Sequence, residues 1–267
     1  MNVSISNIAW EASENEQVVA LLKQYRITSV DLAPSKIWAN PLAVSDREIA
    51  AVRQWWEDRG MTIVGAQSLH FGHPELQLFH SEATRQHLFD FTAKMIAVCG
   101  KLGVSAIVFG SPKNRLRGNL PQAQAMDIAS QFFADLGEVA ITHHTRLCIE
   151  PNSVAYGCDF ITTADEGLEL VKRVDHPGFR LHLDSGNMTM MGEDCVAAIK
   201  KSFAVLQHFH VSEPYLSQVG VANSPVPHAA IAQVLKQLHY NHWVSLEMKG
   251  GQALEQALAF VKVYQNT

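Results

Sequence analysis

The chain has 267 residues, of which 47% are apolar and 18% charged, with a formal net charge of −5 and a pI near 6.2. This length fits one α/β barrel, which typically has about 250 residues, and the composition is that of a globular protein. A net negative charge attracts neither nucleic acid nor an anionic membrane, so neither is an expected partner. No apolar stretch approaches the roughly 18 residues of a membrane span.

The cysteines and the N-terminus indicate a reducing compartment. Four cysteines form no C-x-x-C pair and lie in apolar or helical surroundings: Cys99, Cys148, Cys158 and Cys195. They are predicted to be reduced thiols of the core. The N-terminus has no basic region followed by an apolar run, so no signal peptide is expected. The expected location is the cytoplasm.

Strand and helix patterns alternate through the first half of the chain. Strands are predicted at 3–10, 27–32, 62–69 and 106–109, and helices at 14–25, 45–59 and 82–102. Ser45 and Glu48 have the spacing of a capping box at the start of the second helix. Gly60 and Gly103 are the expected helix stops.

The alternation continues to the end of the chain and predicts a (β/α)8 TIM barrel, an α/β fold, as a single domain over residues 1–267. Strands are predicted at 146–149, 179–184, 205–211 and 243–247, and helices at 121–143, 163–173, 193–202, 228–238 and 252–263. Such alternation implies a parallel sheet. An open dinucleotide-binding sheet would need G-x-G-x-x-G after the first strand, where this chain has Trp10-Glu-Ala-Ser-Glu14. Eight strands favour the closed barrel.

Four successive strands end in an ionisable side chain: Glu150, Asp184, His210 and Glu247. They are separated by 34, 26 and 37 residues (150 to 184, 184 to 210, 210 to 247), about one strand–helix unit each. The active site of such a barrel lies at the carboxyl ends of the strands, so inward-facing terminal residues would converge there.

Three carboxylates and one imidazole in one place indicate a metal site. Without a cation, repulsion between the carboxylates would raise some of their pKa values sharply. Oxygen-rich ligands with one nitrogen suit one divalent ion, with Mn²⁺ as the first choice and Mg²⁺, Co²⁺ or Zn²⁺ as alternatives. The alternative without a metal is four polar strand ends, each capped by a helix N-terminus.

The motifs around these residues resemble a known family. Glu-Pro-Asn follows the fifth strand, Leu-Asp-Ser-Gly the sixth, His-x-Ser-Glu-Pro the seventh and Ser-Leu-Glu-Met-Lys the eighth. Together they resemble the xylose isomerase-like superfamily, particularly its sugar phosphate isomerase/epimerase branch, which includes the D-tagatose 3-epimerase group. The resemblance is strong over residues 146–250; before that it rests on the strand rhythm and His70.

The resemblance implies roles for the four residues and a reaction. Glu150, Asp184, His210 and Glu247 would bind one metal ion, and Glu150 and Glu247 would also transfer the proton. The expected function is isomerisation or epimerisation of a small sugar-like substrate through an enediolate, which needs an electrophile on the carbonyl and a proton-transfer group on each face. A dehydratase, a hydroxypyruvate-type isomerase and a non-catalytic carbohydrate-binding barrel are the alternatives. Members often assemble, so a homodimer or homotetramer is expected.

One position departs from the epimerases, and others argue against a nuclease. Epimerases usually carry a His three residues beyond the Asp, where this chain has Asn187, so the identity of the substrate is in doubt.

The endonuclease IV type of nuclease would need a zinc cluster with further histidines. This chain has His70 after the third strand, but Gly110 and Ser111 after the fourth and Asn187 after the sixth. DNA repair is therefore not expected.

Further side chains are candidates for substrate binding. Asn187 can donate to a hydroxyl, and His70 follows the third strand. His182 and His208 share strand faces with Asp184 and His210 but lie one layer deeper, where a hydrogen bond to a ligand carboxylate is the more natural role. The basic loop after the fourth strand could bind a phosphate or carboxylate of the substrate through Lys113, Arg115 and Arg117.

Overall fold

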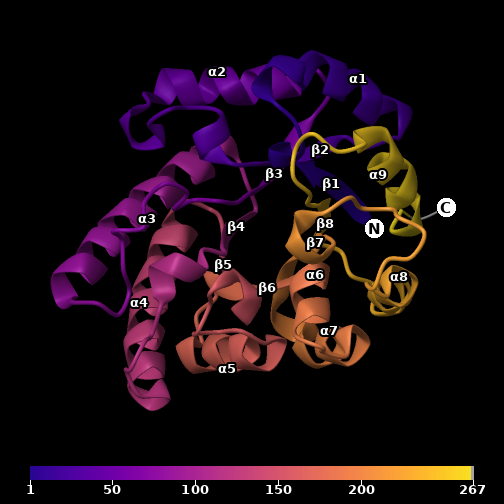
Figure 1. The fold of residues 1–267 in the computed structure, drawn as a ribbon. Helices are drawn as coiled ribbons and strands as arrows, with labels where there is room; N and C mark the ends of the chain where they lie inside the picture. Colours follow the sequence, from indigo (N-terminus) through magenta and orange to yellow (C-terminus); the bar gives the residue numbers. More distant parts are fainter. Residues whose placement is uncertain (266–267) are drawn as a thin grey trace.

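The computed structural model describes residues 1–265 and is a closed barrel of eight parallel strands in chain order (Figure 1). The strands are β1 (Asn2–Ser6), β2 (Ser29–Leu32), β3 (Thr62–Ala66), β4 (Ala106–Phe109), β5 (Leu147–Ile149), β6 (Phe179–Asp184), β7 (Leu206–Val211) and β8 (Trp243–Leu246). Strand β1 pairs with β2 on one side and with β8 on the other, which closes the barrel. The predicted fold class is confirmed.

Helices surround the strands on the outside of the barrel (Figure 1). They are α1 (Asn15–Gln24), α2 (Asp46–Glu57), α3 (Glu82–Leu102), α4 (Gln122–Thr142), α5 (Ala164–Val174), α6 (Ser185–Met190), α7 (Cys195–Ser202), α8 (His228–Gln237) and α9 (Leu254–Phe260). The capping box of α2 is present, because the Glu48 side chain accepts from Ser45 N at 2.8 Å while Ser45 Oγ accepts from Glu48 N. Helix α3 ends at Gly103, which is left-handed at φ 87°.

Strands β1 and β3 end earlier than predicted, and helix α6 was not predicted. Strand β1 ends at Ser6, not at residue 10, because the Ser6 side chain caps a 3-10 helix, Asn7–Ala9. Strand β3 ends at Ala66, not at residue 69, and Ser68 has a left-handed backbone at φ 56°. Helix α6 begins directly after β6, where no helix was predicted.

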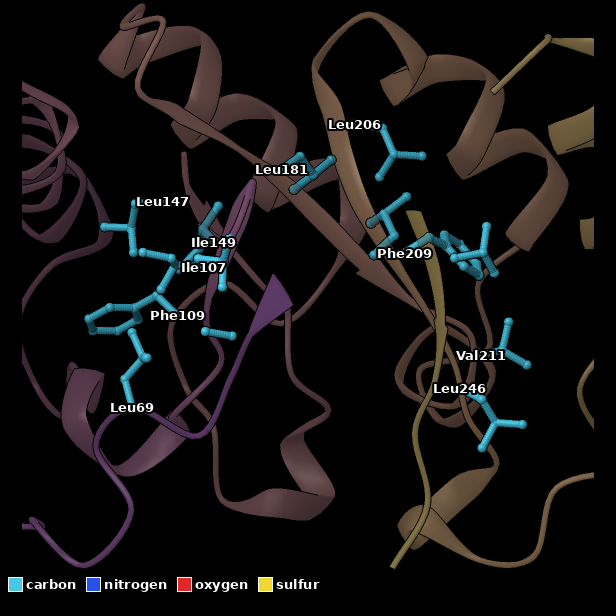
Figure 2. Close-up of a cluster of buried hydrophobic side chains, with 14 of the residues drawn as sticks. Leu69, Ile107, Phe109, Leu147, Ile149, Leu181, Leu206, Phe209, Val211 and Leu246 are labelled. Carbon is cyan, nitrogen blue, oxygen red and sulfur yellow. The ribbon is translucent and has the colours of Figure 1, made fainter. Parts of the chain in front are cut away.

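Alternation along the strands separates an apolar outer layer from a polar barrel interior. Figure 2 shows part of the apolar layer, which includes Ile107, Phe109, Leu147, Ile149, Leu181, Phe209 and Val211. The alternate residues face inward, and several are polar and fully buried: Ser4, Asp31, His182, His208 and Ser245. TIM barrels usually fill this space with branched apolar side chains, so this interior is an exception.

Within residues 1–265, no helix combines the length and the hydropathy that a bilayer crossing requires.

Candidate metal centre and active site

Four ionisable side chains meet at the carboxyl end of the barrel. Glu150 follows β5, Asp184 ends β6, His210 lies near the end of β7 and Glu247 follows β8. Each is at most 9% exposed, and one donor atom from each lies within 4.8 Å of the donor atoms of the others. Asp184 is in register with His210, so the two side chains lie beside each other across the sheet. The sequence prediction that these four residues converge is therefore borne out in the geometry.

Two donors fix the Asp184 carboxylate. Its Oδ1 accepts from the backbone N of Asn187 at 2.6 Å, so Asp184 is the N-cap of α6. Its Oδ2 accepts from Ser212 Oγ, also at 2.6 Å. Gly186 allows this close packing, because a Cβ there would come within 2.5 Å of Ser212 Oγ. Asp184 is thus held as a rigid negative group.

The His210 ring points one nitrogen at the carboxylate cluster and the other into the barrel. Nδ1 lies 3.2 Å from Glu247 Oε2, and Nε2 lies 3.7 Å from Asp31 Oδ2. Burial lowers the pKa of His210, but the Glu247 charge and the Asp31 contact outweigh burial, and the pKa is raised well above its ordinary value. Nδ1 is therefore the atom that faces a cation bound among the four residues.

Burial and mutual repulsion disfavour the charged carboxylates. Burial, then the charges of Glu247 and Asp184, raise the pKa of Glu150 to about 8. Burial and the Glu247 charge raise the pKa of Asp184 to about 6. A divalent cation at this point would reverse both effects, because it supplies the missing positive charge. The donor set therefore fits a metal ion of the hard or borderline kind.

Asp31 on β2 supports the site from below and was missed in the sequence. It is fully buried, and its carboxylate contacts His208 Nε2 at 2.6 Å and Ser4 Oγ at 3.1 Å. Burial raises its pKa, but His208 and then His210 outweigh burial and hold the pKa below its usual range. Gly65 on β3 leaves room for it, since a Cβ there would lie 2.6 Å from Asp31 Cγ. An acidic residue near the end of a buried strand was the available signal.

The histidines below the site do not line the cavity at the barrel mouth. His182 and His208 are fully buried, and the predicted role of either in binding substrate directly is wrong. His182 Nε2 lies 3.9 Å from Glu150 Oε1, and neither of its ring nitrogens has a hydrogen-bond partner within residues 1–265. Burial lowers its pKa well below the ordinary value, so it is neutral.

A cavity of about 300 Å³ opens above the four residues. Its lining includes Glu150, Asn187, His210 and Glu247, together with His70 and Gln67 from the segment after β3. His70 is buried and pairs through Nε2 with Thr92 Oγ1 at 2.8 Å. Burial lowers its pKa to about 3, so it is a neutral wall of the cavity. Gln67, another residue missed in the sequence, donates through Nε2 to Glu247 Oε1.

Asn187, a candidate for substrate binding, lies beside Glu150 and lines the cavity. Its Nδ2 donates to Glu150 Oε1 at 3.3 Å, and its Oδ1 accepts from Ser153 N at 3.0 Å. The side chain therefore connects α6 to the segment that follows β5 and borders the cavity.

Neither Lys113 nor Arg115 of the basic loop after β4 is among the residues that line the cavity. Arg115 is fully buried, and its guanidinium donates to the carbonyls of Phe160, Phe109 and Glu150 at 3.0, 3.1 and 2.6 Å. The prediction that Arg115 binds substrate is therefore wrong, because its donors hold the backbone around Glu150. Lys113 is exposed and lies outside the lining.

Comparison with known proteins gives the family and the fold. The family model described as xylose isomerase-like TIM barrel matches residues 19–264. A D-psicose 3-epimerase from Ruminiclostridium cellulolyticum is 31% identical over 87 residues, which is 33% of this chain but only 29% of that relative. A solved D-psicose 3-epimerase from Clostridium cellulolyticum H10 superposes with a TM-score of 0.78 at 20% identity, covering 99% of this chain and 90% of the other. A 3-keto-D-glucoside 4-epimerase from E. coli has a TM-score of 0.79 at 16% identity, covering 98% and 97%.

Proposed function

The chain belongs to the xylose isomerase-like TIM barrel family, and from this premise we propose that it is a divalent-metal-dependent isomerase or epimerase of a small hydroxy-carbonyl sugar. The observation that carries the proposal is the meeting of Glu150, Asp184, His210 and Glu247 within 4.8 Å at the barrel mouth. The relatives named as sugar epimerases support the same reaction class.

The metal would be held by all four residues, and Mn²⁺ is the ion we propose. His210 would offer Nδ1, and the three carboxylates would offer oxygens. When bound, the ion would polarise the substrate carbonyl and so acidify the adjacent C–H. Asp184 serves as a ligand rather than a proton carrier, since both its oxygens already accept hydrogen bonds.

Glu150 and Glu247 are the proposed proton-transfer pair. One group, as a carboxylate, removes the proton next to the carbonyl, and the other, as a carboxylic acid, returns a proton to the enediolate from the opposite face. Gln67 donates to Glu247, and Asn187 donates to Glu150. These neighbours restrict the rotamers of the two carboxylates, which keeps each one aimed at the substrate.

The test is the exchange of the substrate's α-proton with solvent deuterium, followed by NMR over a panel of ketoses with added Mn²⁺. Glu150→Gln should abolish exchange and leave the circular dichroism spectrum unchanged. The matched control is Glu213→Gln, because Glu213 is equally buried but pairs with His228 Nε2 at 3.0 Å and does not line the cavity. Exchange that survives in Glu150→Gln, or that is undiminished after the metal is chelated, would refute the proposal. Loss of water from the sugar would instead identify a dehydratase.

A further inference from the structure

No lysine or arginine of residues 1–265 lines the cavity to pair with a charged substituent of the substrate. The lining includes instead the carboxylates of Glu150 and Glu247. Three carboxylates around a divalent ion leave a net charge of −1, which repels an anion. Arg115 is already committed to backbone carbonyls. A phosphate or carboxylate on the substrate would therefore lose its hydration without a replacement charge.

Neutral polar groups are available for hydroxyls. Gln67 Oε1 is buried and has no partner in the part of the chain that the structure describes, so it is an acceptor ready for a hydroxyl. Asn152 and Asn187 also border the cavity. Burial raises the pKa of Tyr156 to about 12, so its hydroxyl is uncharged at neutral pH. This chemistry matches an uncharged polyhydroxy compound.

An aromatic rim surrounds the outer end of the cavity. We define it as Phe71 after β3, Tyr156 after β5, and Tyr215 and Leu216 after β7. Phe71 is 77% exposed and lines the cavity, as do Tyr156 and Leu216. Tyr215 is 58% exposed, and its ring lies against that of Tyr156 with centroids 6.0 Å apart. Such exposed rings flanking a ligand cavity offer faces on which a sugar or aromatic ring can stack.

The backbone of the β7 loop holds part of this rim in an unusual conformation. Tyr215 and Leu216 are consecutive non-glycine residues with φ of 61° and 54°. A left-handed conformation is unfavourable for such side chains and persists only where the surroundings enforce it. The rim is therefore a fixed feature, with Leu216 O accepting from Lys249 N at 3.1 Å.

The proposed acid/base pair and the rim differ in their depth within the protein. The proposed acid/base pair is at most 9% exposed, whereas Phe71 is open to solvent. A volume of about 300 Å³ is at the lower end of the range for ligand pockets. It suits one sugar ring at the metal site, and a substituent that reaches the rim must project beyond that ring.

Resting on the proposed function, we infer that the substrate is an uncharged keto-sugar carrying a second ring, as in a glycoside, and that this second ring stacks on the aromatic rim. The reacting ring is bound by the metal site and by neutral donors and acceptors. A free ketose would occupy only the inner part of the cavity, and a sugar phosphate would meet no compensating cation.

The test compares keto-sugars by kcat/KM for exchange of the α-proton with deuterium. The probes are methyl, phenyl and glucosyl 3-keto-D-glucoside, D-psicose, and D-psicose 6-phosphate. The phenyl and glucosyl compounds should react at least tenfold faster than the methyl compound, and the phosphate at least tenfold more slowly than D-psicose. Phe71→Ala and Tyr215→Ala should each lower the phenyl-to-methyl ratio at least threefold. Val263→Ala is the matched control, since Val263 is also exposed but lies beyond the end of α9.

Three other outcomes would refute the inference, and the measurements distinguish them. Equal rates for the methyl and phenyl compounds, or a faster phosphate, would refute it while the proposed function stands. An unchanged ratio in Phe71→Ala together with a changed mass in sedimentation would make the rim a contact between copies of the chain. No exchange with any sugar would refute the proposed function, and the inference with it.

Discussion

Replacing Gly110 by alanine should displace the Glu150 carboxylate without unfolding the barrel. Real Cβ atoms essentially never lie closer than 3.0 Å to another heavy atom, and a Cβ on Gly110 would lie about 1 Å closer than that to Glu150 Oε2. Its other near contacts are Glu150 Cδ at 3.2 Å and Val108 Cγ1 at 3.5 Å, which ask for little movement. Because Oε2 is the end of a flexible side chain, the carboxylate can move by about 1 Å with little loss of folding stability.

Misplacing a catalytic group by 1 Å can cost about 10²-fold in rate. Gly110→Ala should therefore slow α-proton exchange by about that factor for the best substrate of the wild type. The affinity for Mn²⁺, measured by titration calorimetry without any sugar, should fall about 10- to 100-fold. Gly250→Ala is the matched control, because a Cβ there meets its nearest atom, Ile8 O, at 3.5 Å. Wild-type exchange and wild-type metal affinity in Gly110→Ala would refute the placement of Glu150 in the site.

Three further predictions concern stability. In metal-free protein the pKa of Glu150 is raised from 4.5 to about 8. The contribution of Glu150 to the free energy of unfolding is therefore complete below pH 4.5 and declines, by at most about 1.4 kcal/mol per pH unit, as the pH rises to 8. Urea unfolding in the presence of a chelator should show this slope, and Glu150→Gln should reduce it. Asp31→Asn should lower the free energy of unfolding by about 3–5 kcal/mol and weaken Mn²⁺ binding about 10- to 100-fold through His210; unaltered binding would exclude a supporting role. Arg115→Met leaves three backbone carbonyls without their donor, so it should lower the free energy of unfolding by at least about 3 kcal/mol. Arg117→Met, measured in the same way, should lower it by about 1 kcal/mol or less. Equal losses in the two variants would contradict the structural role of Arg115.

The sequence predicted the barrel and the strand-end cluster because both depend on short-range periodicity. Strand alternation fixes which residues share a face, and a separation of one strand–helix unit puts Glu150, Asp184, His210 and Glu247 at equivalent positions. Once the chain closes into a barrel, these four side chains lie together at its mouth. Convergence at the mouth therefore follows from local pattern plus topology.

Two of the missed features depend on contacts between distant parts of the chain. Asp31 pairs with His208 across the barrel interior, a separation of 177 residues that periodicity does not encode. Arg115 was expected to bind an anionic group of the substrate, yet its donors bind three backbone carbonyls that only the folded loops bring together. Ser6 ended β1 early through a side-chain cap that competes with the strand ladder. The first two misses reflect tertiary partners that a single sequence does not display, whereas the Ser6 cap is a local contact with Ile8 N.

The hydrogen bonds of residue 187 separate two tasks, because its backbone binds Asp184 and its side chain binds Glu150. The hydrogen bond that fixes Asp184 Oδ1 comes from the backbone of residue 187, so almost any amino acid there preserves it. The side chain at 187, by contrast, reaches Glu150 and borders the cavity. On the proposed function, substrate preference would therefore change with the residue at 187 while the proposed ligand Asp184 stays in place, whereas a change at 184 would remove that ligand and a helix cap at once.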